Sequence, residues 1–330
     1  MAQKQINNIP GARKASMPGF VAPQLATLVD DPPLGDDWIH EIKFDGYRML
    51  CHLDHGKVSF FSRNQKDWTS KFPGIAKAIN SLEATTAIID GEVVIMDKGG
   101  RTSFQRLQQA MGRGGPGGFI YQAFDLIYLD GFDLSRSPLI ERKEQLKKLI
   151  ATGPKSSVLH YSDHHGGSGE LFFKRACEYD LEGIVSKRAD SQYVSARNRN
   201  WLKVKCGKRQ EFVIAGYIPS DKGLPGFGSL ILGVYEKGKL IYAGRVGTGF
   251  TMKQRAELGK KLDRIARATM PFAIKPDAKG LNEAHWCEPK LVAEVAFTEW
   301  TSDGSIRHPS FQSLREDKKP EDVRRELPAD

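Results

Sequence analysis

The sequence contains no long apolar run, and this absence excludes a helical membrane protein. A helix needs roughly 20 consecutive apolar residues to span a bilayer, and no segment of the 330 residues approaches that length. Residues 1–17 are polar and basic and lack the apolar stretch of a secretory signal. Internal repeats and long low-complexity segments are also absent. We therefore expect a globular intracellular protein without a membrane span.

Cysteine is scarce, and the few cysteines are widely spaced. There are four, and no two of them form a C-x-x-C pair: Cys51, Cys177, Cys206 and Cys287. Zinc ribbons need such pairs, and small disulfide frameworks need a much higher density of cysteines. The sequence thus predicts neither a structural zinc site nor a disulfide framework. We expect buried free thiols.

Basic residues outnumber acidic ones by 49 to 40, which gives a formal net charge of +9. They are spread along the whole chain. Such an excess favours a polyanionic partner, because neutralising phosphates releases condensed counterions. Many basic proteins have no such partner, so the charge is compatible with nucleic-acid binding and does not establish it.

The length suits two domains of ordinary size. Strand-like alternation and helical periodicity intermix up to about residue 207. The clearest strands there are Trp38–Ile42, Met49–Asp54, Lys57–Phe61, Ile88–Met96, Phe119–Leu129, Ile184–Lys187 and Trp201–Cys206, and the clearest helices are Leu139–Ile150 and Leu171–Tyr179.

From Phe212 onward, strand-like runs separated by glycine-rich turns surround one helical segment, Met252–Ala266. About five strands with a single helix suit a small closed barrel such as an OB-fold. We therefore divide the chain into a flexible N-terminal arm (1–16), an α+β domain (17–207), the barrel domain (208–318) and a C-terminal tail (319–330).

Four segments of the first domain place charged residues inside or at the end of an apolar strand. They are Glu41-Ile-Lys43-Phe-Asp45-Gly46-Tyr-Arg48, Asp90-Gly91-Glu92, Glu182-Gly183-Ile-Val-Ser-Lys187 and Trp201-Leu-Lys203-Val-Lys205. Because side chains alternate along a strand, Glu41 and Lys43 point to one face, and so do Lys203 and Lys205. Burial of several charges is costly unless they pair or meet a charged ligand. Solvated strand edges would explain any one segment alone, but the four together indicate something more specific.

Taken in order, these segments resemble the motifs of the covalent nucleotidyltransferases, which include ATP-dependent DNA ligases, RNA ligases and mRNA capping enzymes. Their signature begins K-x-D-G, here Lys43-Phe44-Asp45-Gly46. The later motifs are matched by Ser62-Arg63, Asp90-Gly91-Glu92, Phe124-Asp125, Glu182-Gly183 with Lys187, Lys203 with Lys205, and in the second domain by Arg307-His-Pro-Ser-Phe311 and Arg315-Glu-Asp317-Lys318. A lone K-x-D-G is weak evidence, whereas the whole ordered set of motifs leaves little room for coincidence. The resemblance implies an ATP-grasp-like nucleotidyltransferase (adenylation) domain of the α+β class, followed by a C-terminal OB-fold β-barrel.

The segment before the nucleophile narrows the resemblance. Pro23-Gln24-Leu-Ala and Gly35-Asp-Asp-Trp38 are similar to the ligase module of bacterial ligase D, a family that repairs double-strand breaks by end joining with Ku. The similarity covers about residues 17–318. Ligase D usually carries polymerase and phosphoesterase modules that this sequence does not contain. We therefore expect either a stand-alone relative or a module cut from a longer protein.

The resemblance implies an ATP-dependent DNA ligase that acts through a covalent lysyl-AMP. Lys43 would attack the α-phosphate of ATP, the AMP would pass to the DNA 5′-phosphate, and the 3′-hydroxyl would then displace it. A free lysine has a pKa of about 10.4 and is mostly protonated at neutral pH. Nearby cations disfavour the ammonium form. We therefore expect Lys203, Lys205 and a bound Mg²⁺ or Mn²⁺ to lower the pKa of Lys43 and to stabilise charge on the phosphates.

The same resemblance implies roles for the acidic and aromatic motif residues. Glu182, together with Glu92, would bind the divalent metal, because carboxylates are hard ligands for a hard cation. Glu92 and Arg48 would hold the ribose, and Phe124 would stack on adenine. Glu41 would accept a hydrogen bond from the adenine amino group and repel the guanine carbonyl, which favours ATP over GTP.

The remaining basic motif residues are expected to bind phosphates. Lys187 belongs to the nucleotide-binding set, and Arg63 would approach the DNA end or its phosphate. Arg315 and Lys318 resemble the motif that contacts the leaving pyrophosphate, so they would swing over the ATP site during the first step, with the segment near Gly207 as hinge. The expected partners are broken duplex DNA and Ku, and we expect a monomer in the cytoplasm at the nucleoid.

Four other assignments are weighed against this one. An mRNA capping guanylyltransferase shares the nucleophile motif and the OB-fold, but Glu41 and the ligase-D-like segment count against it. Many RNA ligases lack a motif like Arg315–Lys318, and a NAD⁺-dependent ligase would need zinc cysteines. A non-catalytic nucleic-acid-binding protein with the same fold would be expected to have lost Lys43 or Glu182, and both are present.

Overall fold

The computed structural model describes residues 6–97, 99–112, 118–153, 155, 158–221, 223–278 and 280–327. These residues form two compact units. The first consists of the chain up to Cys206 together with Leu327, and the second spans Gly207–Glu326. The boundary expected from the change in sequence texture was residue 207. Each unit has its own hydrophobic core.

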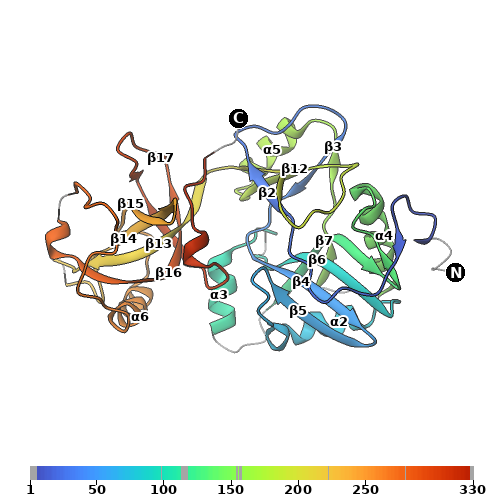
Figure 1. Cartoon of the computed structure of the whole chain (residues 1–330), viewed down its shortest axis with the longest axis horizontal. Coiled ribbons are helices and arrows are strands. Elements are labelled where there is room, and N and C mark those ends of the chain that lie inside the picture. Colours follow the sequence, from blue (N-terminus) through green and yellow to red (C-terminus); the bar gives the residue numbers. More distant parts are fainter. Residues whose placement is uncertain are drawn as a thin grey trace. The chain divides into compact units, whose positions relative to one another are not determined.

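The first unit contains a mostly antiparallel large sheet, formed in the described part of the chain by seven strands (Figure 1). In spatial order they are β1 (Arg13–Lys14), β8 (Phe132–Asp133), β7 (Phe119–Leu129), β6 (Thr86–Ile95), β4 (Tyr47–Asp54) and β5 (Lys57–Ser62), with β9 (Leu159–Tyr161) paired in parallel to β7. Alternation along β4 sends Tyr47, Met49 and Cys51 to one face and Leu50 to the other.

Helices cover one face of the large sheet. They are η1 (Thr69–Lys71), α2 (Pro73–Asn80), α3 (Phe104–Gly112) and α4 (Leu139–Thr152). Ile75 and Ile79 of α2 and Leu146 of α4 are buried in the same core as Met49 and Cys51. Because these side chains recur at helical spacing, burying them against the alternating face of β4 stabilises both elements.

A small sheet of five strands forms the second layer of this unit within the described residues. Its order is β10 (His165–Gly166), β3 (Trp38–Ile42), β11 (Gly183–Arg188), β12 (Arg197–Lys205) and β2 (Leu25–Leu28). Helix α5 (Gly169–Glu178) packs on its outer face through Phe172 and Ala176. The other face meets the large sheet, because Trp201 of β12 shares a core with Leu50 and Phe124.

The second unit is built around a five-stranded antiparallel sheet. In the described residues its order is β15 (Lys239–Val246), β14 (Ser229–Glu236), β13 (Lys208–Ile218), β16 (His285–Phe297) and β19 (Ser310–Leu314). The amide of Phe311 in β19 donates to the carbonyl oxygen of Thr248, just after β15, at 2.9 Å. This bond links the two outer strands, as expected for a sheet that curls into a barrel.

Shorter elements complete the second unit. They are α6 (Met252–Asp263), η2 (Leu281–Glu283), the hairpin of β17 (Glu299–Trp300) with β18 (Ile306–Arg307), and η3 (Pro320–Asp322). Thr251 and Gln254 form a reciprocal capping box that fixes the start of α6. Leu258 and Leu262 of this helix join the core of the sheet.

Both chain ends require a correction to the expected division. Residues 1–16 were expected to form a flexible arm, but Ile6 and Ile9 are buried in the core of the first unit and β1 pairs with β8. A tail was expected over 319–330, but within its described part, residues 319–327, Val323 is buried in the core of the second unit. In both segments, isolated apolar residues within polar sequence supply the anchors.

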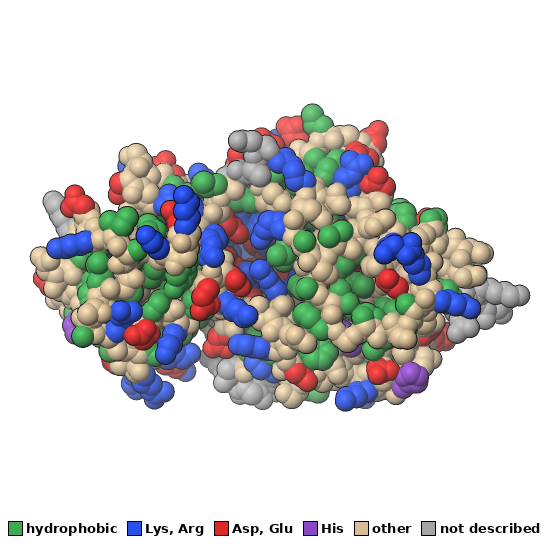
Figure 2. All heavy atoms as spheres, viewed as in Figure 1, with side chains coloured by type: hydrophobic (Ala, Val, Ile, Leu, Met, Phe, Trp, Pro, Cys, Tyr) green, Lys and Arg blue, Asp and Glu red, His purple; other side chains and the backbone are tan. Residues whose placement is uncertain are grey.

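Lys and Arg side chains are distributed over the visible face of each unit and mix with acidic and apolar ones (Figure 2). No helix among the described residues is long and apolar enough to cross a bilayer.

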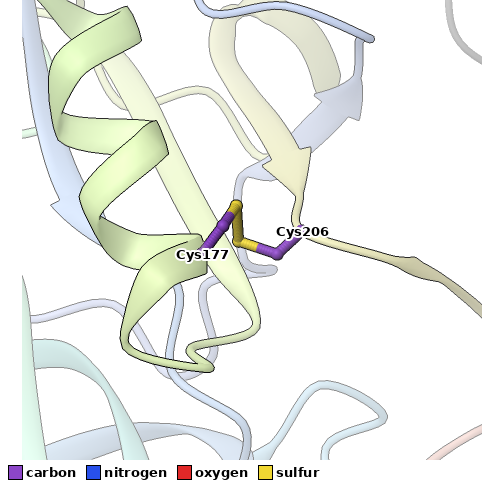
Figure 3. Close-up of a disulfide and its surroundings, with 2 residues drawn as sticks. All are labelled: Cys177 and Cys206. Atoms are coloured by element: carbon purple, nitrogen blue, oxygen red, sulfur yellow. A yellow bond between two sulfur atoms is a disulfide. The ribbon is translucent and has the colours of Figure 1, made fainter.

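Two cysteines form a disulfide, which corrects the expectation of free thiols for that pair. Cys177 lies in the last turn of α5, and Cys206 directly follows β12 (Figure 3). Their Cα atoms are 5.2 Å apart. The bond ties α5 to the end of β12, one residue before the second unit begins. Cys51 and Cys287 are free and buried, as expected.

Candidate active site

The K-x-D-G segment carries the chain from the small sheet to the large one. Lys43 follows β3 directly, and its amide donates to the carbonyl oxygen of Gly183 at 2.9 Å, so strand pairing extends to the lysine. Asp45 accepts a hydrogen bond from the amide of Phe104 at 3.2 Å and thereby holds the start of α3. Gly46 has no room for a side chain, because a Cβ there would lie 2.2 Å from the carbonyl oxygen of Val93. The segment is therefore fixed from both sides.

Lys43 forms an ion pair with Glu182. Its Nζ lies 2.5 Å from Glu182 Oε1, and the two side chains are 22% and 6% exposed. Burial lowers the pKa of Lys43, but the charge and hydrogen bond of Glu182, with the charges of Glu92 and Asp45, outweigh burial and raise that pKa above its ordinary value. The expected lowering by Lys203 and Lys205 is therefore not what the chain's own residues produce.

The strand register of the small sheet aligns the expected site residues on one face. Glu41, Val185 and Lys203 are direct partners across β3, β11 and β12. Two residues further along in each direction, and so on the same face, Lys187 pairs with Trp201 and Gly183 pairs with Lys205. Since partners across a sheet share a face, the lysines of β11 and β12 lie on the same side as Glu41.

Gly183 is required in this arrangement. Its φ is +147°, and a Cβ at this position would lie 2.0 Å from the carbonyl oxygen of Val204. The close approach lets β11 pair with β12 directly beside Glu182.

Phe124 and Trp201 bring the two sheets together around cations. Their rings meet edge to face, with centroids 6.1 Å apart. Lys187 Nζ lies 4.4 Å from the centroid of Phe124 and 4.3 Å from that of Trp201, and the Arg48 guanidinium lies 5.3 Å from Phe124. The Nε1 of Trp201 is buried and has no hydrogen-bond partner among the described residues. The aromatic and basic residues expected to bind the nucleotide are thus neighbours.

Arg48 is held by Asp90, which sits one strand away. The two side chains form a bidentate pair with distances of 3.0 and 2.5 Å, and Tyr193 donates to the same carboxylate at 2.7 Å. Glu92 is the direct cross-strand partner of Arg48. The pair expected to hold the ribose therefore lies side by side on β4 and β6.

Glu41 lies in a buried group that we call the Glu41 cluster, defined as Glu41, Lys143, Lys187 and Ser162. Its Oε1 is 2.8 Å from Lys143 Nζ and 2.9 Å from Lys187 Nζ, and its Oε2 accepts from Ser162 Oγ at 3.1 Å. Burial raises the pKa of Glu41, but the two ammonium groups outweigh burial and lower it. Burial lowers the pKa of Lys187 to about 8, with Lys143 adding to this and Glu41 opposing it. One carboxylate thus faces two ammonium groups.

The other expected residues belong to other segments of the chain. Arg63 follows β5, and no described residue forms an ion pair with it. In the second unit, Arg315 forms a bidentate pair with Asp317 at 2.8 Å and lies 3.6 Å from Glu294. Lys318 lies 2.9 Å from Glu211. Both cations of this motif are therefore bound by carboxylates of their own unit.

Two buried cations are not among the site residues expected from the sequence. Arg142 and Lys143 occupy buried positions of α4 between Leu139 and Leu146. Arg142 forms a bidentate pair with Asp125 at 2.7 and 2.9 Å, and both side chains are fully buried. The signal was present in the sequence, because the two basic residues stand within an apolar stripe at i, i+3, i+4 and i+7.

The acidic residues near Lys43 suit a hard divalent cation. Glu182 and Glu92 both act on the charge of Lys43, and Mg²⁺ is commonly bound by one or two carboxylates together with substrate phosphates. No group of three or more His, Cys, Asp or Glu side chains that would form a complete protein cage occurs in the described residues. Glu182 and Glu92 would hold a metal of this kind together with the phosphates of its substrate.

Comparison with known families agrees with this arrangement. Residues 23–205 match the family model of the ATP dependent DNA ligase domain, and residues 224–318 match that of the ATP dependent DNA ligase C terminal region. The chain belongs to the ATP-dependent DNA ligases. Both the enzyme class and the fold expected from the motifs, a nucleotidyltransferase domain followed by an OB-fold region, are confirmed.

The ligase is similar to bacterial end-joining proteins over most of its length. It is 38% identical over 319 residues to the multifunctional non-homologous end joining protein LigD of Pseudomonas aeruginosa, covering 96% of this chain and 38% of that protein. It is 36% identical to LigD of Mycobacterium tuberculosis, covering 93% and 40%. The chain thus spans about two fifths of these relatives. The prophage-derived DNA ligase-like protein LigB of Bacillus subtilis is 33% identical over 90% of this chain and 99% of its own.

Solved structures give the same assignment. A mycobacterial DNA ligase D complexed with ATP and MES is 35% identical, with a TM-score of 0.69, covering 93% of this ligase and 98% of that chain. The ligase domain of Mycobacterium tuberculosis LigD is 34% identical with a TM-score of 0.51. The expected similarity to the ligase module of ligase D is confirmed.

Proposed function

We propose that this ligase seals DNA breaks through a lysyl-AMP formed on Lys43 and serves the repair of double-strand breaks by end joining. The observation that carries the proposal is the position of Lys43. It lies where the chain passes between two sheets, is 22% exposed and is paired to the buried carboxylate of Glu182. Lys203 and Lys205 project from the same face of the small sheet and would neutralise phosphates there.

The chemistry consists of three transfers. In the first, Lys43 Nζ loses its proton and bonds to the α-phosphorus of ATP, while the bond to the β-phosphate oxygen breaks and pyrophosphate leaves. In the second, a DNA 5′-phosphate oxygen takes the AMP and the lysine amine is restored. In the third, the 3′-hydroxyl bonds to the 5′-phosphorus, loses its proton, and AMP leaves.

The raised pKa of Lys43 sets a requirement for the first transfer. The ammonium must lose the proton that Glu182 and its acidic neighbours stabilise. Mg²⁺ or Mn²⁺ held by Glu182 and Glu92 would offset these carboxylates and the charge of the triphosphate. Replacing Glu182 with Gln should therefore alter the metal concentration needed for adenylylation, which a metal titration would measure.

Recognition of the nucleotide is assigned to residues around Phe124. We propose that Phe124 stacks on adenine, that Arg48 and Glu92 hold the ribose and that Glu41 reads the amino group. Lys187 lies beside both Phe124 and Glu41 and would belong to the same nucleotide-binding set. Glu41→Ala should weaken use of ATP and narrow the gap between ATP and GTP. Equal labelling of the wild type by both nucleotides would favour a capping enzyme instead.

The nucleophile is tested by covalent labelling. With α-labelled ATP and a divalent cation, the wild type should become labelled and Lys43→Ala should not. Lys57→Ala, an exposed lysine on β5, is the matched control and should label normally. Labelling of Lys43→Ala at the wild-type level would place the nucleophile elsewhere.

The role of the second unit is tested by separating the steps. We propose that Arg315 and Lys318 contact the leaving pyrophosphate and exchange their present carboxylate partners for it. Alanine at either position should slow lysyl-AMP formation severely, yet leave sealing of a nick that already carries 5′-AMP much less affected. Equal losses in both assays would indicate misfolding or a role in DNA binding.

End joining is the proposed biological setting, because the relatives named LigD are described as end-joining proteins. DNA affinity should be largely electrostatic and fall steeply with salt, given the basic side chains of both units (Figure 2). Arg63 is proposed to contact the DNA end. A cognate Ku should raise joining of ends more than sealing of nicks by holding the ends together. Unchanged end joining with Ku at every salt concentration would contradict this setting.

We also propose that the enzyme acts as a monomer in the cytoplasm, at the nucleoid. Light scattering would test the first point, and the distribution of a fluorescent fusion would test the second.

A further inference from the structure

Helix α4 contributes a fully buried lysine, Lys143, which contacts two residues proposed to bind the adenine base, Glu41 and Phe124. Lys143 has a side-chain exposure of 0%, and burying an ammonium group is costly unless each N–H finds an acceptor. The Nζ of Lys143 lies 2.8 Å from Glu41 Oε1, and it donates to the carbonyl oxygens of Ser162 at 2.9 Å and Phe124 at 3.5 Å. Three donors thus meet three acceptors.

The acceptors come from three separate segments. Glu41 lies on β3, Phe124 on β7, and Ser162 directly follows β9. Two of the three are the residues proposed to recognise adenine, one through its carboxylate and the other through its ring. A single ammonium group therefore fixes the backbone under the stacking ring and the carboxylate beside it.

Lys143 and Lys187 share Glu41 but differ in how they are held. Lys143 is anchored by two backbone carbonyl groups in addition to Glu41. The Nζ of Lys187 donates a hydrogen bond to Glu41 and otherwise faces the rings of Phe124 and Trp201. Lys143 is thus the fixed partner of the carboxylate, whereas Lys187 lies on the aromatic side where the base is expected.

We propose that Lys143 is a positioning residue that sets the preference of this ligase for adenine. It does not touch the nucleotide. It orients Glu41 and anchors the backbone of Phe124, so that the carboxylate accepts from an amino group at a defined place above the ring. This inference rests on the proposed function, because it takes from it the roles of Glu41 and Phe124.

The test compares Lys143→Met with Lys147→Met. Lys147 lies one turn further along α4 and is exposed, with its Nζ 5.5 Å from the centroid of Tyr161, a ring that Lys143 also approaches, at 4.8 Å. Lys143→Met should raise the ATP concentration for half-maximal adenylylation at least tenfold and reduce the preference for ATP over GTP. The maximal adenylylation rate and sealing of a 5′-adenylylated nick should stay within about threefold of wild type. Lys147→Met should match the wild type in every assay.

Two further variants separate positioning from general damage. Lys143→Arg keeps the charge and should restore part of the ATP preference. If Lys143 acts through Glu41, then Glu41→Gln should change the preference in the wild type but add little in the Lys143→Met background. If Lys143→Met does not fold, the same comparison can be made with Lys143→Arg and with the Glu41→Gln/Lys143→Met double variant. The double variant removes the charges of Glu41 and Lys143 together and retains Lys187.

The inference is overturned if Lys143→Met keeps the wild-type ATP requirement and nucleotide preference. It is also overturned if sealing of the adenylylated nick falls as much as adenylylation does, because the effect would then not be confined to the base site. Failure of the proposed function looks different. In that case the wild type itself would not form a lysyl-AMP that Lys43→Ala abolishes.

Discussion

The disulfide between Cys177 and Cys206 allows a quantitative prediction about the first unit. The two residues are separated by 29 positions in the sequence, and closing a loop of this length in the unfolded chain corresponds to about 3.6 kcal/mol of stability at 25 °C. Both residues belong to the first unit, so only that unit should lose stability when the bond is reduced. With a urea dependence of about 2–3 kcal/mol per molar, its unfolding midpoint should fall by about 1–2 M.

The assay is urea unfolding of the oxidised and reduced protein, with thiols counted under denaturing conditions. Oxidised protein should show two thiols, from the buried Cys51 and Cys287, and reduced protein four. The matched control is the Cys177→Ser/Cys206→Ser double variant. Its midpoint should resemble that of the reduced wild type and should not respond to reductant.

The same disulfide bond lies next to the candidate active site. The amide of Cys206 donates to the carbonyl oxygen of Glu182 at 3.0 Å, and Lys205 precedes Cys206 in the chain. Reduction should therefore slow adenylylation only modestly while these backbone contacts persist. Four free thiols in the untreated protein, or identical midpoints with and without reductant, would refute the reasoning.

Two further predictions concern buried charges. Because the pKa of Lys187 falls from 10.5 to about 8 in the folded protein, the unfolded chain holds a proton between pH 8 and 10.5 that the folded chain has lost, and the free energy of unfolding should rise with pH in that window. Urea unfolding of Lys187→Met should lack this part of the rise, and identical pH slopes in both proteins would contradict the assignment. Asp125→Asn should destabilise the first unit by about 3 kcal/mol or more, because the buried Arg142 loses its counter-charge, and Asp125→Leu/Arg142→Met should recover most of that loss. A change below about 1 kcal/mol for Asp125→Asn in urea unfolding would show that the pair is not isolated from solvent.

Strands with local apolar alternation were the most predictable part of the fold. The predicted bounds of Trp38–Ile42 and Phe119–Leu129 coincide with β3 and β7. The start of β12 was not predictable, since its residues 197–200 read Arg-Asn-Arg-Asn and have no apolar alternation. Arg197 and Asn198 pair in parallel with β2, and the register shifts between Asn198 and Leu202. Pairing with a distant segment supplies hydrogen bonds that the local sequence pattern does not indicate.

In the candidate site, too, the sequence predicted how residues are oriented along a strand but not which residues they contact. The motifs predicted that Glu41 and Lys43 share a face of a strand, because a period of two is a local property. They did not predict the partners of these residues, Lys143 and Glu182, which come from segments far along the chain. The disulfide was missed for the same reason, because Cys177 and Cys206 meet only when α5 packs on the small sheet.

The difference between the expectation from the sequence and the structure is greatest for the protonation of Lys43. From the sequence, Lys43 was expected among cations that lower its pKa, since Lys203 and Lys205 are the basic residues of the nearby motifs. In the structure the carboxylate of Glu182 is 2.5 Å from its Nζ, and a contact at that distance outweighs cations that stand a strand further away, because Coulomb energy falls with separation. The motifs therefore indicate candidate residues for the chemistry, while the protonation of these residues depends on distances that only the folded chain sets. For this ligase, the lysine proposed to act as a free amine is held as an ammonium by the same carboxylate that is proposed to bind the metal, so we expect activation of Lys43 and binding of the cation to be one event.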